Sequence, residues 1–207
     1  MTDLNEKQLE ILQVAEQLFA EEGFDGTSIR DIAKKANINI AMISYYFGSK
    51  EKMLEGLLLN RIADMRLQLE NLYNENIPPF AKVDKMVELY IRRINKNRCI
   101  YQILHFEFST KKRELNFESF TEMKRNNLET FKNIIKEGQD SGEFQQDINV
   151  ALLPPVIMGT YFQFHQNKPF YMNILDLKTE EEYNNYITTT LTQHIQKTIK
   201  ALLVYEN

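Results

Sequence analysis

Residues 27 to 52 constrain the fold of this chain more strongly than any other segment. Apolar side chains recur at helical spacing within residues 29–36 and again within 40–47, with only three residues between the two runs. In this gap, Asn37 stands where a tight turn needs a left-handed backbone, and Asn39 is a good N-cap for the second run. The pattern predicts two short helices joined by a sharp turn, which is a helix-turn-helix.

The residues before this motif complete a small helical domain. Gly23 is a predicted helix stop, after which Phe24 folds back on the preceding helix, and Ser28 with Asp31 approximates a capping box for the next one. Residues 7–22 form the first helix, and its apolar stripe consists of Ile11, Leu12, Ala15, Leu18 and Phe19.

A helix-turn-helix of this kind presents its second helix to the major groove of DNA, so the motif favours DNA binding. Overall charge does not supply that binding. The chain has a net charge of −4, and residues 1–53 carry six Lys and Arg against nine Asp and Glu. Because phosphate contacts depend on where the cations lie, a locally basic face is required. The cations nearest to the motif are Lys34, Lys35, Lys50 and Lys52.

The rest of the chain also has helical spacing, and the whole chain contains only seven Gly and five Pro. Ser49 caps a helix to about residue 74, and Pro78 with Pro79 interrupts the pattern. Further helices are predicted at 80–97, 99–109, 115–139, 147–166 and 180–204, with a loop around Lys168 and Pro169. The helix at 147–166 is interrupted or restarts at Pro154 and Pro155. Residues 162–175 alternate enough to leave a strand open. The predicted fold class is all-α, with a helix-turn-helix domain at residues 1–50 and a second helical domain at 51–207.

Several protein classes lack support in the sequence. No apolar run approaches the roughly 18 residues that a membrane span needs, and the first residues do not resemble a secretion signal, so a cytoplasmic location is expected. The single cysteine, Cys99, excludes an internal disulfide, and the three histidines are too dispersed to predict a metal site. No nucleophile elbow or Gly-rich phosphate loop occurs, so neither an enzyme nor a cofactor is expected.

The spacing of many residues resembles the DNA-binding domain of the TetR family of transcriptional regulators over about 50 residues. These are Ala15, Leu18, Phe19, Gly23, Phe24, Thr27, Ser28, Ile29, Ile32, Ala33, Ala36, Ile38, Tyr45, Tyr46, Phe47, Gly48, Ser49, Lys50, Glu51, Met53 and Leu54. Asn37 replaces a frequent Gly, and Ser44 a frequent aromatic residue. The resemblance implies a homodimer that binds a palindromic operator on double-stranded DNA, usually as a repressor, and a C-terminal domain with a small-molecule pocket.

The second helix of the motif would supply the base contacts, although Ile40 to Tyr46 contain no Arg or Gln. Methyl contacts, the Ser44 hydroxyl and DNA shape would then contribute more to specificity. Thr27, Tyr45, Tyr46 and Lys50 look like the phosphate anchors of the family. The predicted DNA-binding set is Thr27, Ser28, Asn39, Ala41, Met42, Ser44, Tyr45, Tyr46 and Lys50. Taken singly, Thr27 can instead be a cap, Tyr46 a core residue and Lys50 a solvated charge.

The C-terminal domain gives weaker indications of an effector site. Its candidate lining is mostly apolar with a few polar anchors, and an apolar or aromatic effector is expected. The set is Tyr90, Ile103, His105, Phe106, Glu107, Phe120, Met158, Tyr161, Phe162 and His165. All of these residues can also be ordinary core residues, and Glu107 a helix-surface glutamate.

The two last long helices are predicted to build the dimer interface, with Gly159 allowing close approach. The predicted interface stripe is Leu153, Ile157, Phe164, Ile187, Leu191, Ile195 and Leu202. Packing within one subunit remains open for this stripe. For the whole protein, an enzyme on a helical scaffold, a helix-turn-helix protein that binds other proteins, and an activator in place of a repressor also remain open.

Overall fold

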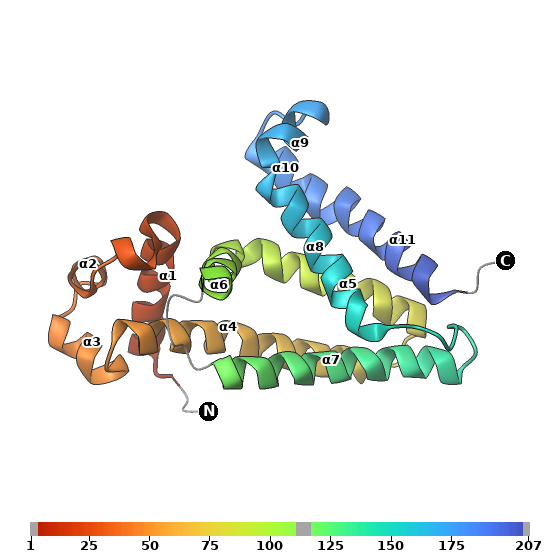
Figure 1. Cartoon of the computed structure of the whole chain (residues 1–207), viewed down its shortest axis with the longest axis horizontal. Helices are drawn as coiled ribbons and strands as arrows, with labels where there is room; N and C mark the ends of the chain where they lie inside the picture. The colour runs from red at the N-terminus through yellow and green to blue at the C-terminus, as the bar shows by residue number, and fades with distance from the viewer. Residues whose placement is uncertain (1–3, 111–116, 205–207) are drawn as a thin grey trace. The chain divides into compact units, whose positions relative to one another are not determined.

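The computed structural model describes residues 4–110 and 117–204, except the side chains of 62–64, 105, 106, 108–110, 117, 119, 120 and 123. The described residues are helical and contain no strand, as the sequence predicts (Figure 1). The first helices are α1 (Glu6–Gly26), α2 (Ile29–Lys35), α3 (Ile40–Phe47), α4 (Lys50–Tyr73), α5 (Pro79–Lys96), α6 (Arg98–Thr110) and α7 (Phe117–Asp140). They are followed by η1 (Val150–Leu152), α8 (Leu153–Gln166), α9 (Lys168–Ile174), α10 (Glu180–Tyr186), η2 (Ile187–Leu191) and α11 (Thr192–Leu203).

The chain forms two compact units, and neither is continuous in sequence. Unit 1 contains residues 1–64 and 97–123, and unit 2 contains residues 65–96 and 124–207. Packing therefore groups residues 51–64 and 97–123 with the N-terminal helices, whereas the sequence suggested a boundary at residue 50. Two helices, α4 and α7, contribute residues to both units.

Unit 1 is held together by one apolar core that joins α1, α2, α3, α4 and α6. Helix α1 bends at Gly23, which has a positive φ of 75°, so that Phe24 returns to the core and its ring lies 5.1 Å from that of Phe19. Helix α6 inserts Ile100, Ile103 and Leu104 into the same core. This packing explains why α6 belongs to the N-terminal unit.

Unit 2 is organised around α5, which packs against both α8 and α11, and these two helices also contact each other (Figure 1). An ion pair lies at the start of α5: the ammonium of Lys82, a residue that is 4% exposed, lies 2.7 Å from a carboxylate oxygen of Glu137 on α7. The same ammonium donates to the Tyr73 carbonyl at 2.8 Å. Removing Glu137 would leave the buried Lys82 ammonium without its opposite charge. Through these contacts Lys82 ties the end of α4 to α5 and α7.

The predicted terminal helix is continuous from α10 to α11 but contains a π-helical turn, η2. Thr192 Oγ1 donates to the Ile187 carbonyl at 2.8 Å across this wider turn. Buried residues recur every four positions along it: Tyr183, Ile187, Leu191, Ile195, Ile199 and Leu203. A regular α-helix has about 3.6 residues per turn, so residues spaced four apart would turn progressively away from the core. The π-helical turn contains more residues than an α-helical one and compensates for part of that rotation.

Two sequence expectations for this region are corrected. Residues 168–174, expected as a loop or part of a strand, form the short helix α9, because Pro169 occupies its first turn, where no backbone N–H is needed. The preceding helix does not begin at Asp147: a 3₁₀ turn starts at Val150, and α8 follows from Leu153 with its prolines in the first turn.

Candidate nucleic-acid interface

Helices α2 and α3 are fixed by caps at each end of the turn that joins them. Ser28 and Asp31 form a capping box, in which the Asp31 N–H donates to Ser28 Oγ at 3.1 Å and the Ser28 N–H donates to Asp31 Oδ2 at 3.0 Å. Asn37 has the predicted left-handed backbone, with φ 52°. Asn39 Oδ1 accepts from the Ala41 N–H at 2.9 Å, so it caps α3 as the sequence indicated.

The capping box also sets the ionisation of Asp31. The Ser28 hydroxyl donates to Asp31 Oδ2, and the Ser28 N–H donates to the same oxygen. Both bonds lower the pKa of the Asp31 carboxyl below its ordinary value of 3.8, and the bond from the Ser28 hydroxyl has the larger effect. The carboxylate also lies in the first turn of α2, where the helix dipole favours negative charge.

Helix α3 has one buried face and one exposed face. Ile43 and Phe47 are 1% and 8% exposed and anchor α3 in the core of unit 1. Tyr45 is 84% exposed, Ala41 and Ser44 are also exposed, and Met42 and Tyr46 are half-buried. The structure therefore presents Ala41, Ser44 and Tyr45 together, as the helical spacing predicts, on an element that is rigidly held from behind.

Two predicted phosphate anchors make contacts inside unit 1. Thr27 is 1% exposed, and both its hydroxyl and its N–H donate to the Gly23 carbonyl, at 2.8 and 3.2 Å. The Lys50 ammonium donates to the carbonyls of Phe24 and Thr27, at 2.7 and 2.8 Å. These contacts close the connection between α1 and α2, and the assignment of both residues to phosphate stays a prediction.

Other cations lie on the surface of unit 1 around the motif. Arg30, Lys34, Lys35 and Lys52 are exposed, and Lys35 lies 3.7 Å from Glu21. Arg30 forms no ion pair with any described residue, yet it was absent from the predicted DNA-binding set. Its position two residues before the buried Ile32 was a usable signal, because side chains at that spacing point to nearly opposite sides of a helix.

The predicted effector residues are distributed over both units. The side chains of His105, Phe106 and Phe120 lie outside the described residues. Ile103 and Glu107 belong to unit 1, while Tyr90, Met158, Tyr161, Phe162 and His165 belong to unit 2. Glu107 is only 1% exposed, so it is a buried carboxyl and the surface alternative is wrong. The Tyr90 ring packs edge-on against that of Phe131, at 5.2 Å.

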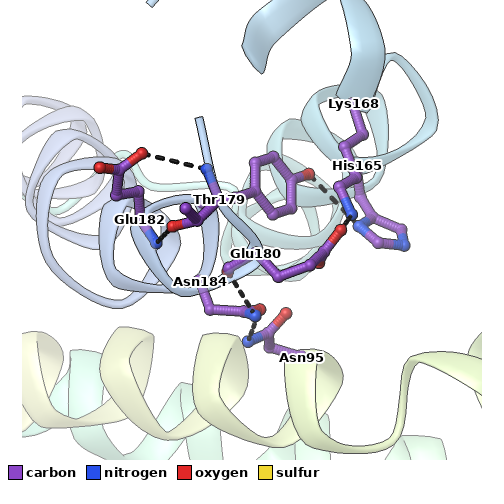
Figure 2. Close-up of polar contacts among 8 residues, drawn as sticks. Asn95, His165, Lys168, Thr179, Glu180, Glu182 and Asn184 are labelled. Carbon is purple, nitrogen blue, oxygen red and sulfur yellow. Dashed lines mark hydrogen bonds and ion pairs between the residues drawn. The ribbon is translucent and has the colours of Figure 1, made fainter. Parts of the chain in front are cut away.

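Within unit 2, two residues of this set, Tyr161 and His165, take part in hydrogen bonds near the start of α10, and Figure 2 shows the contacts of His165, Asn95 and Asn184. Tyr161 donates to Asn95 Oδ1 at 2.9 Å, and Asn95 in turn donates to Asn184 Oδ1 at 3.4 Å. His165 Nδ1 lies 3.3 Å from the Tyr183 hydroxyl, and its ring stacks on Tyr161. The network joins α8 to α5 and α10, and an effector-binding part for these residues stays a prediction.

The predicted dimer stripe is corrected by its burial within one protomer. Leu153, Ile157, Phe164, Ile187, Leu191 and Ile195 are between 0% and 7% exposed, so they have no surface left for a partner. Only Leu202 of that set is exposed, at 45%. An apolar stripe on an amphipathic helix indicates burial, and here α5, α8 and α11 bury one another.

Gly159 lies on the outer face of α8. It is exposed, and a Cβ atom added to it would meet no atom within 4 Å, so nothing in the protomer requires a glycine there. The described helices include none that is long and apolar enough to cross a membrane. Over the same residues, no three His, Cys, Asp or Glu side chains lie close enough together to hold a metal ion.

Comparisons with known proteins account for most of the chain. Residues 11–57 match the family described as bacterial regulatory proteins, tetR family, and residues 79–199 match the tetracyclin repressor-like C-terminal domain. The chain is 25% identical to the HTH-type transcriptional repressor KstR2 of Rhodococcus jostii over 146 residues, which are 70% of this chain and 72% of that repressor. It is 29% identical to the probable HTH-type transcriptional regulator YttP of Bacillus subtilis over 150 residues, or 72% and 70% of the two chains.

Among solved structures, the fold is similar to that of the transcriptional regulator FadR from Bacillus subtilis, crystallised in complex with stearoyl-CoA. The TM-score is 0.72 at 19% identity, and the match covers 94% of this chain and 98% of that chain. These relatives are transcriptional regulators and not enzymes. The second family match alone spans more than half of the sequence, from residue 79 to 199. The chain therefore belongs to the TetR family of bacterial transcriptional regulators.

Proposed function

We propose that this protein is a ligand-responsive repressor that binds a palindromic operator as a dimer and leaves it when a small, largely apolar effector binds. The observation that carries the proposal is the exposed face of α3, formed by Ala41, Ser44 and Tyr45 on a helix whose other side is fixed in the core. A rigid, capped helix of this kind fits the major groove, where base edges are recognised.

Phosphate contacts would position this helix and supply most of the affinity. Arg30 and Lys52 are exposed on α2 and at the start of α4. Tyr46 is half-buried beside Tyr45, and its ring lies 5.3 Å from that of Tyr45. We include Arg30 in the interface because its guanidinium is accessible and can donate two parallel hydrogen bonds to one phosphate group.

Coupling between effector and DNA is supported by the course of the chain. Helix α6 packs in the same apolar core as α1, and α4 and α7 run through both units. A ligand that binds one arrangement of these helices more tightly than another shifts the equilibrium between them, and so changes DNA affinity. The stearoyl-CoA bound to the structural neighbour supports an effector with a long apolar part.

The dimer would form through the outer faces of α8 and α11, since their inner faces are used within the protomer. Exposed Gly159 on α8 leaves room for a partner helix to approach closely. Leu202 and Val204 at the end of α11 are 45% and 41% exposed and add apolar area to this surface.

Selection of bound sequences from random duplex DNA, at near-physiological salt, tests the DNA-binding part of the proposal. An enriched palindrome is expected, because two copies of α3 would read inverted half-sites. Stearoyl-CoA, and stearate as a probe without the nucleotide, are then titrated into the complex, and release of DNA by either is expected. Absence of enrichment from folded, dimeric protein would instead favour a protein-binding module. A reporter with the selected site placed over a promoter distinguishes a repressor from an activator.

A further inference from the structure

The surface that α3 turns to solvent carries no ionised group. Ile40 is 43% exposed, Tyr45 is 84% exposed, and Ala41 and Ser44 are exposed between them. Ala41, Ser44 and Tyr45 fall on the side of the helix that faces away from the buried Ile43 and Phe47. Ile40 is in register with the buried pair but is exposed at the start of α3. The groups available to base edges on this side are methyl groups, one aromatic ring and two hydroxyls.

Direct recognition of the other base features needs side chains that α3 lacks. Guanine is usually read by the paired donors of Arg or Lys, adenine by Asn or Gln, and cytosine by an acidic acceptor. The one amide at this site, Asn39, already uses its Oδ1 to accept from the Ala41 N–H at 2.9 Å. It therefore cannot turn freely to form the two-bond pair with adenine. The Lys50 ammonium is likewise occupied by the carbonyls of Phe24 and Thr27.

Thymine offers the base feature that matches the apolar part of this surface, because its C5-methyl group projects into the major groove and binds apolar side chains. We infer that this protein recognises its operator half-sites through thymine methyl groups, contacted by the Tyr45 ring and the Ala41 methyl, so that A·T pairs lie beneath α3. The inference rests on the proposed function, since it specifies the DNA that the same helix binds.

Tyr45 is held in place for such a contact. Its ring lies edge-on to Tyr46 at 5.3 Å, and Tyr46 lies edge-on to Phe47 at 6.3 Å, so a series of aromatic rings runs outward from the core. A ring that is positioned before binding loses less conformational freedom when it meets the methyl group. Its large exposed area is then covered on binding, which favours association.

Methyl recognition is tested by replacing thymine with deoxyuridine in the selected operator, one position at a time and then throughout both half-sites. Deoxyuridine keeps every hydrogen-bonding group of thymine and lacks only the methyl group. Affinity is expected to fall about fourfold for each methyl whose burial is lost. Replacing a contacted T·A pair by 5-methylcytosine·guanine is expected to retain more affinity than replacing it by cytosine·guanine.

Protein variants show which side chain meets the methyl group. Tyr45→Ala is expected to abolish the deoxyuridine penalty at one thymine in each half-site, whereas Tyr45→Phe, which keeps the ring, retains it. Because Tyr45 is 84% exposed, neither change disturbs the core. The control Lys52→Ala, at an exposed cation, is expected to weaken all duplexes alike and leave the penalty unchanged.

The outcomes distinguish failure of methyl recognition from failure of the proposed function. An operator that binds equally well with deoxyuridine throughout would overturn methyl recognition while leaving DNA binding intact. Half-sites with a G·C core that lose affinity when 7-deazaguanine replaces guanine would overturn it as well. A deoxyuridine penalty that persists in Tyr45→Ala and reappears outside the half-sites would point to DNA shape and exclude the contact. Failure to enrich any sequence would overturn the proposed function itself.

Discussion

The Lys50 ammonium lies 2.7 Å from the Phe24 carbonyl oxygen and 4.2 Å from the centre of the Phe24 ring. One lysine thus holds both the backbone and the side chain of the residue that follows the bend of α1 at Gly23. It also donates to Thr27, just before α2. A residue that the family resemblance predicts to contact phosphate is therefore also part of the scaffold that orients α2 and α3.

Replacement of Lys50 is expected to affect both stability and DNA binding. Lys50→Met keeps the aliphatic stem but loses two charged hydrogen bonds, so the free energy of unfolding should fall by about 1.5–3 kcal/mol in urea unfolding. If the third ammonium hydrogen reaches a phosphate, the slope of log affinity against log salt falls by about one unit per protomer. An unchanged slope would leave Lys50 with a structural part alone. Lys52→Ala is the matched control, expected to leave stability unchanged within about 0.5 kcal/mol.

The capping box predicts a pH-dependent contribution to stability. Hydrogen bonds from Ser28 lower the pKa of Asp31, so they stabilise the folded form fully above the ordinary value of 3.8 and are lost as pH falls through the lower folded-state pKa. Asp31→Asn should therefore be less stable than the wild type at pH 7, and this difference should shrink below pH 3.8. Urea unfolding at several pH values measures it, with Ser28→Ala as the second variant. A difference that stays constant with pH would contradict the assignment.

Two helical glycines predict opposite effects of the same substitution. A Cβ on Gly138 would lie 2.2 Å from a ring atom of Phe144, a residue that is 1% exposed. Gly138→Ala should therefore lower the free energy of unfolding by about 1–3 kcal/mol, despite the better helix propensity of alanine. Gly159→Ala meets no atom and should raise it by up to about 1 kcal/mol. Thermal and urea unfolding of the two variants measure the contrast, and equal signs would contradict it.

The same glycine tests the proposed dimer surface. Gly159→Gln adds bulk on the outer face of α8, where the protomer has space, so folding should be preserved while a closely packed partner is displaced. The dissociation constant of the dimer should rise about tenfold or more in sedimentation equilibrium. Gly56→Gln is the control, since this helical glycine also has no neighbour within 4 Å and lies on α4. Equal dimer affinity in both variants would place the interface elsewhere.

Local features of the DNA-binding unit were predictable because they depend on neighbouring residues. The left-handed Asn37, the Asn39 cap and the Ser28–Asp31 capping box are each determined within about four residues of sequence. The contacts of Lys50 with Phe24 and Thr27 were not predictable in this way, since they join residues more than 20 positions apart. Spacing showed where Lys50 lies in the motif but not which atoms it would meet.

The partner of an apolar helix face and the domain boundary share one property that spacing does not reveal. An apolar stripe shows that a helix face is covered, but it carries no information on which element covers it. Ile187 and Ile195 are covered within the protomer, and Ile100 and Ile103 of α6 are covered by the N-terminal helices. Leu202 was expected on the buried stripe because it lies seven residues after Ile195, yet the buried positions follow a spacing of four to Leu203.

The π-helical turn at Ile187–Leu191 determines where the terminal helix can lose a residue. It takes up one residue more than a regular α-helix would need to give the two ends of the terminal helix the same relative orientation. Deleting one of Thr188, Thr189 or Thr190, all exposed, would convert it to regular helix and leave both ends facing the core. The same deletion after Ile195 would rotate the end of the helix by about 100°. This short threonine segment is thus where the loss of one residue leaves the packing of both ends of the helix unchanged.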